Sequence, residues 1–116
     1  MMQITKKVVM AGLVSLLALS ACERADPRLE RLAVGIGKDS VTAVMDGEQP
    51  KRVDPYLNNG QYLEAMLYPR KGKTDSASFL DRNMTPVVVI NGKLAGWGWT
   101  YWDSAAAANH IPVAPK

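Results

Sequence analysis

Apolar residues follow two different spacings along the chain, and the change between them comes at Pro50. Before Pro50 they recur every three or four positions, as in amphipathic helices, and after it they alternate or form short runs, as in strands. The pattern predicts two short N-terminal helices followed by about three antiparallel strands, an α+β fold in two layers. Both helices would cover the same face of the sheet.

The first helix is expected to begin with Asp26 as its cap and Pro27 in its first turn. Its apolar face would consist of residues three or four positions apart, namely Leu29, Leu32, Ala33 and Ile36. The second helix is expected to begin at Asp39 or Ser40 and to end at Asp46-Gly47. Its inward residues would be Val41, Val44 and Met45.

Residues 51–56 predict a weak edge strand, because Pro55 cannot donate a backbone hydrogen bond. Stronger strands are expected at 61–68 and 86–90, with a return strand at 94–99. Along residues 61–68, alternate side chains would face opposite sides of the sheet. Two turn signals separate these strands, Asn58-Asn59-Gly60 and Asn91-Gly92. A polar loop is expected at 69–82, and a short helical turn capped by Asp103 or Ser104 would follow the last strand.

The amino-terminal segment has the features of an export signal. Lys6 and Lys7 precede an apolar run from residue 8 to residue 21. The tetrapeptide Leu19-Ser20-Ala21-Cys22 resembles the lipobox of bacterial lipoproteins, which implies cleavage before Cys22 and acylation of its thiol. The apolar run is shorter than the roughly 20 residues of a membrane-spanning helix, so a lipid anchor is expected. The alternative is an unmodified cysteine behind an uncleaved helix.

Removing 21 of the 116 residues would leave 95, enough for one small domain. The predicted organisation is a signal peptide at 1–21, a lipidated N-terminus and linker at 22–28, an interaction domain at 29–102 and a helical turn with a loose tail at 103–116. Without the two signal-peptide lysines, 12 basic residues stand against 11 acidic ones. A net charge of +1 does not indicate a nucleic-acid-binding protein.

A second resemblance lies between the predicted helices. The stretch Gly35-Ile36-Gly37-Lys38-Asp39-Ser40-Val41, followed by Met45, Gly47 and Pro50, resembles the pattern of SmpA/OmlA (BamE-like) outer-membrane lipoproteins and of the related β-lactamase-inhibitor-like domains. In those proteins a glycine breaks the first helix, Ser or Thr caps the second, and Gly-x-Pro leads into the first strand. The likeness spans roughly residues 29–99. Gly37 occupies the capping position here, so Asp39 or Ser40 is expected to cap instead, and two residues separate Gly47 from Pro50.

The resemblance implies an accessory of outer-membrane protein assembly or of envelope integrity. In enteric-type lipoproteins, an aspartate after the lipidated cysteine is the signal for retention in the inner membrane. Glu23 occupies that position here. The periplasmic face of the outer membrane is therefore the expected location, ahead of the inner membrane.

All three tryptophans lie in the run Gly96-Trp97-Gly98-Trp99-Thr100-Tyr101-Trp102. On a strand, Trp97, Trp99 and Tyr101 would share one face. These rings would either complete the core or form an exposed platform for a protein partner, a glycan or a lipid headgroup. Arg70, Lys71 and Lys73 leave a similar choice between a solvated loop and a contact with anionic lipid or an acidic partner.

No pattern indicates an enzyme. His110 is the only histidine, and no motif links it to a serine nucleophile. No cluster has the spacing of metal ligands, and no glycine-rich phosphate loop precedes a helix, so neither a metal nor a cofactor is expected. The sequence predicts a non-catalytic domain whose partners are the membrane, through its lipid, and an envelope protein. The alternative is a ligand-binding or enzyme-inhibitor module whose aromatic strand grips a soluble enzyme or a glycan.

Overall fold

The computed structural model describes residues 26–115. Cys22 and the predicted signal peptide lie outside these residues. The elements follow in the order η1 (Pro27–Arg31), α2 (Lys38–Val44), β1 (Arg52–Asn58), β2 (Gln61–Tyr68), η2 (Ser76–Phe79), η3 (Asp81–Asn83), β3 (Thr85–Ile90), β4 (Lys93–Trp97) and α3 (Trp99–Ala108), where η denotes a 3₁₀ helix. Among residues 26–115, no helix is long and apolar enough to cross a bilayer.

The four strands form one antiparallel sheet in the order β1-β2-β3-β4. The α+β class is therefore confirmed, but the sheet has four strands rather than about three. Both predicted hairpin turns are present. Asn59 and Gly60, at φ 52° and 79°, and Asn91 and Gly92, at φ 51° and 83°, adopt the left-handed conformation that a two-residue hairpin turn requires.

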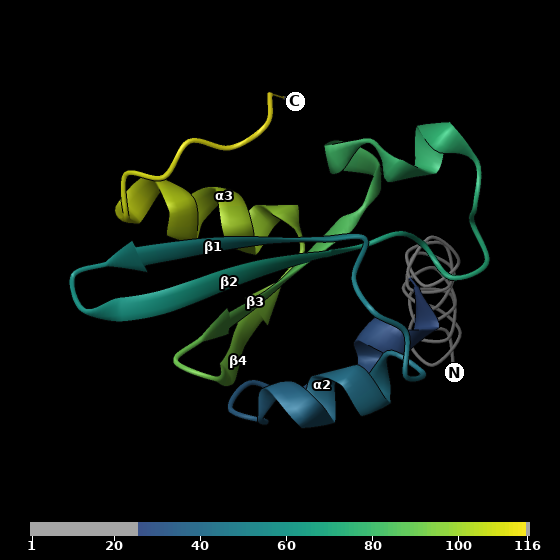
Figure 1. The fold of residues 1–116 in the computed structure, drawn as a ribbon, viewed down its shortest axis with the longest axis horizontal. Coiled ribbons are helices and arrows are strands. Elements are labelled where there is room, and N and C mark those ends of the chain that lie inside the picture. Colours follow the sequence, from purple (N-terminus) through teal and green to yellow (C-terminus); the bar gives the residue numbers. More distant parts are fainter. Residues whose placement is uncertain (1–25, 116) are drawn as a thin grey trace, which may run out of the picture.

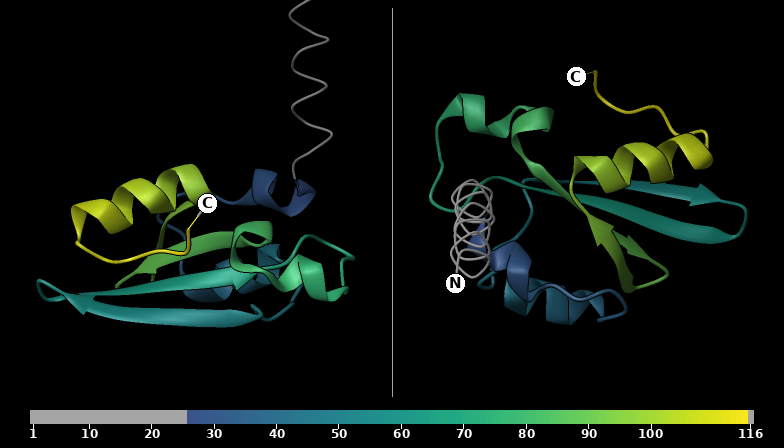
Figure 2. Two further views of the ribbon diagram at one scale, coloured as in Figure 1. Left: turned by 90° about the horizontal axis from the view of Figure 1, so that it is seen from above. Right: turned by 180° about the vertical axis from the view of Figure 1, so that it is seen from behind.

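Helical elements cover both faces of the sheet, so the molecule has three layers rather than two (Figure 1). η1 and α2 lie on one face, which we call the α2 face. α3 lies on the other, the α3 face, and the view from behind shows the same order of layers (Figure 2, right). The predicted N-terminal pair does lie on one face of the sheet. The two-layer prediction is wrong because α3, expected only as a short helical turn from Asp103 or Ser104, is a ten-residue helix that covers the other face.

The start of the first helix is as predicted, but its length is not. The Asp26 carboxylate accepts a hydrogen bond from the Arg28 backbone N–H at 3.0 Å, and Pro27 occupies the first turn. The element is a five-residue 3₁₀ helix. Its extension towards Ile36 is absent, since Leu32 is already extended.

α2 begins at Lys38 with Gly37 as its N-cap, so the prediction that Asp39 or Ser40 caps this helix is wrong. The reason is tertiary. The Lys38 backbone N–H donates to the carbonyl of Gly92 at 3.0 Å, and Gly37 forms a bridge with Lys93. The β3–β4 turn therefore supplies a partner for one of the first N–H groups of α2, which have none inside the helix, and holds the helix start at Lys38 without a side-chain cap.

The aromatic run divides between two elements. β4 ends at Trp97 and α3 begins at Trp99, so both the predicted strand to residue 99 and the helix start at Asp103 or Ser104 are wrong. Gly98, at φ 89°, turns the chain in a conformation that residues with side chains rarely adopt. Trp102 and Ala106, four positions apart, then face the sheet from α3. The helix runs without a break through residues 102 and 103, where the sequence predicted a boundary between the domain and its C-terminal tail.

Each face of the sheet has its own apolar cluster. The cluster on the α2 face contains Leu32, Val41, Met45, Met66, Tyr68, Val87, Val89 and Leu94. The cluster on the α3 face contains Leu63, Ala65, Val88, Trp102 and Ala106. Alternate residues of β2 enter different clusters, which confirms the predicted alternation along residues 61–68.

Candidate functional site

A cavity of about 540 Å³ lies between η1, the segment from β2 to β3 and the first turn of α3. We call it the Trp99 groove. Apolar side chains in its lining are Leu29, Met84 and Trp99, basic ones are Arg70, Lys73 and Arg82, and acidic ones are Asp26 and Asp75. The groove therefore brings together three of the predicted partner-binding residues, Trp99, Arg70 and Lys73, which the sequence placed in two separate segments.

Trp99 is held firmly in the wall of this groove. Its indole Nε1–H donates to the carbonyl oxygen of Met84 at 2.8 Å. The Arg82 guanidinium lies 4.0 Å from the centroid of the ring, within the range of a cation–π contact. Because both its edge and its face are engaged, Trp99 presents a half-buried surface of fixed orientation.

Arg82 is itself fixed by two other segments. Its guanidinium donates to both carboxylate oxygens of Asp103 at 2.9 Å, and also to the carbonyl of Ala114. These bonds join the groove to α3 and to the C-terminal segment. Nothing in the sequence pattern indicated this role for Arg82, since its partners lie 21 and 32 positions away.

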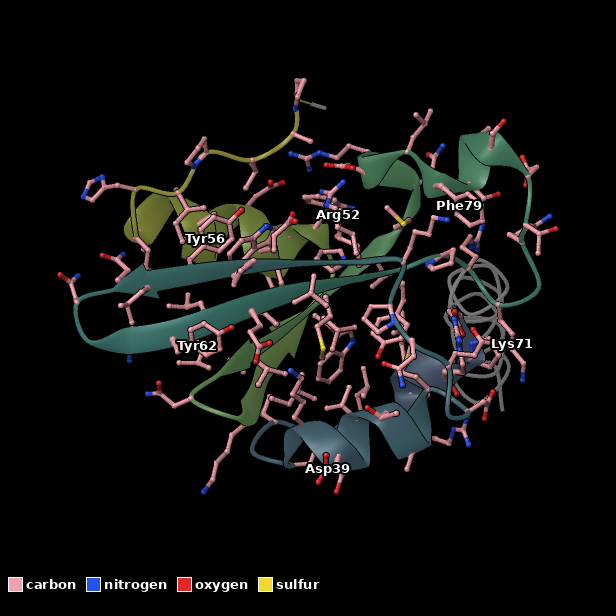
Figure 3. The ribbon with its side chains drawn as sticks, in the orientation of Figure 1. Asp39, Arg52, Tyr56, Tyr62, Lys71 and Phe79 are labelled. Atoms are coloured by element: carbon pink, nitrogen blue, oxygen red, sulfur yellow. The ribbon has the colours of Figure 1, made fainter. Side chains whose placement is uncertain are left out.

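The basic residues of the loop after β2 lie beside the start of η1. Arg70, Lys71 and Lys73 are exposed, and with Asp26 and Pro27 they line a second cavity of about 290 Å³. The Lys71 side chain pairs with Asp46 at 3.1 Å, and its backbone N–H donates to Asp26 at 3.2 Å. Figure 3 shows Lys71 at the end of the molecule opposite the β1–β2 turn.

A buried ion cluster joins this loop to η1 and to the segment that precedes β1. Arg28 is fully buried and donates to the Asp26 carboxylate at 2.7 Å and 3.1 Å. Its remaining donors reach Glu48 and the carbonyl of Pro69, each at 3.0 Å. Burial of the Asp26 carboxyl would raise its pKa, but the hydrogen bonds from Arg28 outweigh that effect and hold the pKa below its ordinary value. The Asp26-Pro27 cap signal pointed to this position, but not to the burial of Arg28.

The predicted aromatic platform does not exist as a single strand face. Trp97 packs against the cluster on the α2 face, whereas Trp99 and Tyr101 pack against the cluster on the α3 face. Tyr101 lies so close to Gly96 that a Cβ on that glycine would come within 2.5 Å of the ring. The prediction that Trp97, Trp99 and Tyr101 share one face is wrong because Gly98 ends the strand between the two tryptophans.

A second exposed surface lies on the α2 face of the sheet. Val53, Leu57 and Tyr62 are 38%, 79% and 44% exposed there. Tyr62 and Tyr56 point to opposite sides of the β1–β2 hairpin (Figure 3). The two-residue turn makes Asn58–Gln61 a hydrogen-bonded pair, and such pairs alternate along an antiparallel ladder. The backbone N–H and C=O groups at positions 53, 55 and 57 of β1 therefore point away from β2, towards the open edge of the sheet. Pro55 lacks an N–H, and this edge is therefore a poor template for strand addition.

Within residues 26–115, no group of three or more His, Cys, Asp or Glu side chains could hold a metal ion. Comparisons with protein-family models, with curated proteins and with solved structures found no match. The resemblance to SmpA/OmlA lipoproteins therefore stays a prediction that rests on the sequence pattern.

Proposed function

We propose that this chain is a lipid-anchored lipoprotein of the bacterial envelope whose domain binds a partner and catalyses no reaction. The Trp99 groove is the observation that carries the proposal. A fixed indole ring lies in one cavity with the exposed cations Arg70 and Lys73. Trp and Arg are the residues most often found at the energetic centres of protein interfaces.

The chemistry of the groove favours a polypeptide segment with both acidic and apolar side chains. Leu29, Met84 and Trp99 provide apolar surface. Three basic residues of the lining stand against two acidic ones, of which Asp26 is already bonded to Arg28. The excess of positive charge would attract a carboxylate and raise the rate of encounter. We propose that the partner is a protein of the outer-membrane assembly or integrity machinery, and this part is supported by the SmpA/OmlA resemblance.

The volume of the groove supports a second candidate, a module that binds a small ligand or inhibits an enzyme. Small-molecule sites have volumes of about 300–1,000 Å³, and the groove, at about 540 Å³, falls within that range. In this candidate Trp99 would contact the ligand from α3, since the aromatic strand first expected is not present.

Photo-crosslinking in intact envelopes tests the binding proposal. A crosslinking residue at Ala77, which is exposed in the lining of the groove, is compared with one at Gln61 on the far hairpin. We expect a discrete adduct with a membrane-embedded assembly protein from position 77 only. The double variant Arg70→Glu/Lys73→Glu should abolish it. Arg31→Glu/Lys93→Glu, which changes one exposed arginine and one exposed lysine outside the lining of the groove, should not.

An adduct with a soluble hydrolase, or retention of a small molecule on purification, would favour the second candidate. Equal crosslinking from positions 77 and 61 would contradict the groove as the binding site. The lipid anchor is tested separately by mass spectrometry of the mature protein. An acylated Cys22 is expected, and the Cys22→Ser variant should leave the membrane fraction.

A further inference from the structure

We infer that the domain lies against the bilayer through one fixed face, formed by Pro27 with Arg70, Lys71 and Lys73. We call it the basic face. The inference rests on the proposed lipid anchor at Cys22. It deepens that proposal by assigning the surface of the domain that meets the membrane.

The length of chain between the lipid and the domain is the first argument. Four residue steps separate Cys22 from Asp26. A fully extended chain spans at most ~3.3–3.6 Å per residue, so the two Cα atoms are at most about 14 Å apart. Asp26 is therefore held within a short distance of the headgroup layer, and any surface next to Asp26 is held there too.

The ion cluster around Arg28 is the second argument, because it prevents Asp26 from being drawn away from the domain. Asp26 accepts hydrogen bonds from the Arg28 side chain and from the Lys71 backbone N–H. Arg28 is fully buried and also bonds to Glu48 and to the carbonyl of Pro69. The tether thus leaves the domain at a fixed point, beside the first residues of the basic loop.

Charge is the third argument, and together with the short tether it favours a lipid surface as the occupant. Three basic side chains, Arg70, Lys71 and Lys73, surround the cavity next to Asp26 and Pro27, and all three are exposed. Basic residues close to a lipid anchor are attracted to anionic headgroups. The Trp99 groove shares Arg70 and Lys73 with this face, so it opens at the level of the headgroups. A partner bound there would be a membrane-proximal segment.

Two lysines at a distance provide matched controls. Lys38 and Lys93 lie by the β3–β4 turn, where the Lys38 backbone is bonded to Gly92. Figure 1 shows this turn away from η1 and from the loop after β2. Lys38 is paired with Glu64, as Lys71 is with Asp46, while Lys73 and Lys93 are both exposed. Each lysine of the basic face therefore has a counterpart in a comparable setting.

The test measures acetylation of individual lysines by a membrane-impermeant amine reagent, with mass spectrometry as the readout. The lipidated protein is compared on zwitterionic vesicles, on anionic vesicles and in detergent. On both kinds of vesicle, we expect Lys71 and Lys73 to react several-fold more slowly than in detergent. Lys38 and Lys93 should be unchanged, and the slowing should be greater on anionic vesicles.

Equal slowing of all four lysines, or greater slowing of Lys38 and Lys93, would overturn the inference. The experiment separates two claims, the lipidation of Cys22 and the contact of the basic face with the bilayer. A free Cys22 thiol would contradict the proposed lipidation, and the same thiol can then be coupled to a maleimide lipid. The acetylation pattern of the coupled protein decides whether the basic face meets the bilayer.

Discussion

The two faces of the sheet are covered to different extents. On the α3 face, Tyr56 of β1 packs on Trp102, with ring centroids 5.9 Å apart, and the Asn58 side chain donates to the carbonyl of Asn109 at 2.9 Å. α3 and the residue that follows it therefore cover this face as far as the edge strand β1. On the α2 face, Leu57 and Tyr62 of the same hairpin remain exposed.

The difference lies in how the covering segments are held. α3 has ten residues, and Ile111 and Val113 of the segment after it pack on the same apolar cluster. α2 has seven residues, and η1 beside it is fixed at one end of the molecule by the Arg28 ion cluster. The α3 face is covered through apolar contacts. On the α2 face, the buried ion cluster around Arg28 fixes η1, and apolar side chains of the β1–β2 hairpin remain exposed.

The largest effect is expected from Arg28→Leu. Removing one partner of a buried ion pair leaves the other charge uncompensated, which costs about 3–5 kcal/mol. We expect a loss of this size in the free energy of unfolding, measured by urea denaturation. Arg31→Leu is the control, because the Arg31–Asp46 pair is exposed and should contribute little. Equal effects of the two variants would show that the cluster does not hold the α2 face together.

On the α3 face, the contact between Gly96 and Tyr101 predicts the next largest effect. A Cβ at position 96 would lie 2.5 Å from Tyr101 Cδ1, and overpacking of this kind costs about 1–3 kcal/mol. Gly96→Ala should therefore lower the midpoint of urea denaturation. In the double variant Gly96→Ala/Tyr101→Ala the two effects should not add, because the clash is removed. Strict additivity would contradict this packing.

Acid should remove the stabilisation that Asp26 provides to the α2 face. The pKa of Asp26 is lower in the folded chain than the value of about 3.9 expected when unfolded, so its stabilisation is complete above that value. This contribution is lost as the pH falls through the folded pKa. Asp26→Asn should be less stable than wild type at pH 7, and the difference should shrink at about pH 3. Unfolding curves at both pH values test this, and a constant difference would contradict it.

A smaller gain is expected from Tyr68→Phe. The Tyr68 hydroxyl is buried and has no hydrogen-bond partner among the described residues. Leaving such a group unpaired costs about 1–3 kcal/mol, so its removal should raise the free energy of unfolding by about 1 kcal/mol. Tyr62→Phe on the exposed hairpin is the matched control. A loss of stability in Tyr68→Phe would show that the hydroxyl has a partner in solution.

The smallest effect is expected at the open part of the α2 face. Leu57→Ser alters a side chain that is 79% exposed and should change stability by no more than about 0.5 kcal/mol. Leu63→Ala, in the same hairpin but fully buried, is a positive control that stands outside this ranking and should cost about 2–5 kcal/mol. A large loss in Leu57→Ser would mean that something covers this surface in the folded protein.

Local sequence signals were sufficient for the hairpins and for the chain start. Asn59-Gly60 and Asn91-Gly92 set their turns through backbone conformation alone, and alternation along 61–68 assigned β2 side chains to the two faces. The Asp26 cap was likewise predictable, because it bonds to a residue only two positions away. These features depend on neighbours within a few residues.

Long-range packing decided the rest. The run from Gly96 to Trp102 has the composition of a strand, yet only its first two residues belong to β4, and from Trp99 onward it forms a helix from which Trp102 reaches the apolar cluster on the α3 face. The Trp99 groove depends on Arg82, whose partners Asp103 and Ala114 are distant in sequence. The basic face depends on Arg28, which reaches the Pro69 carbonyl 41 positions away. Such contacts exist only once the sheet has formed, so no local pattern could have revealed them.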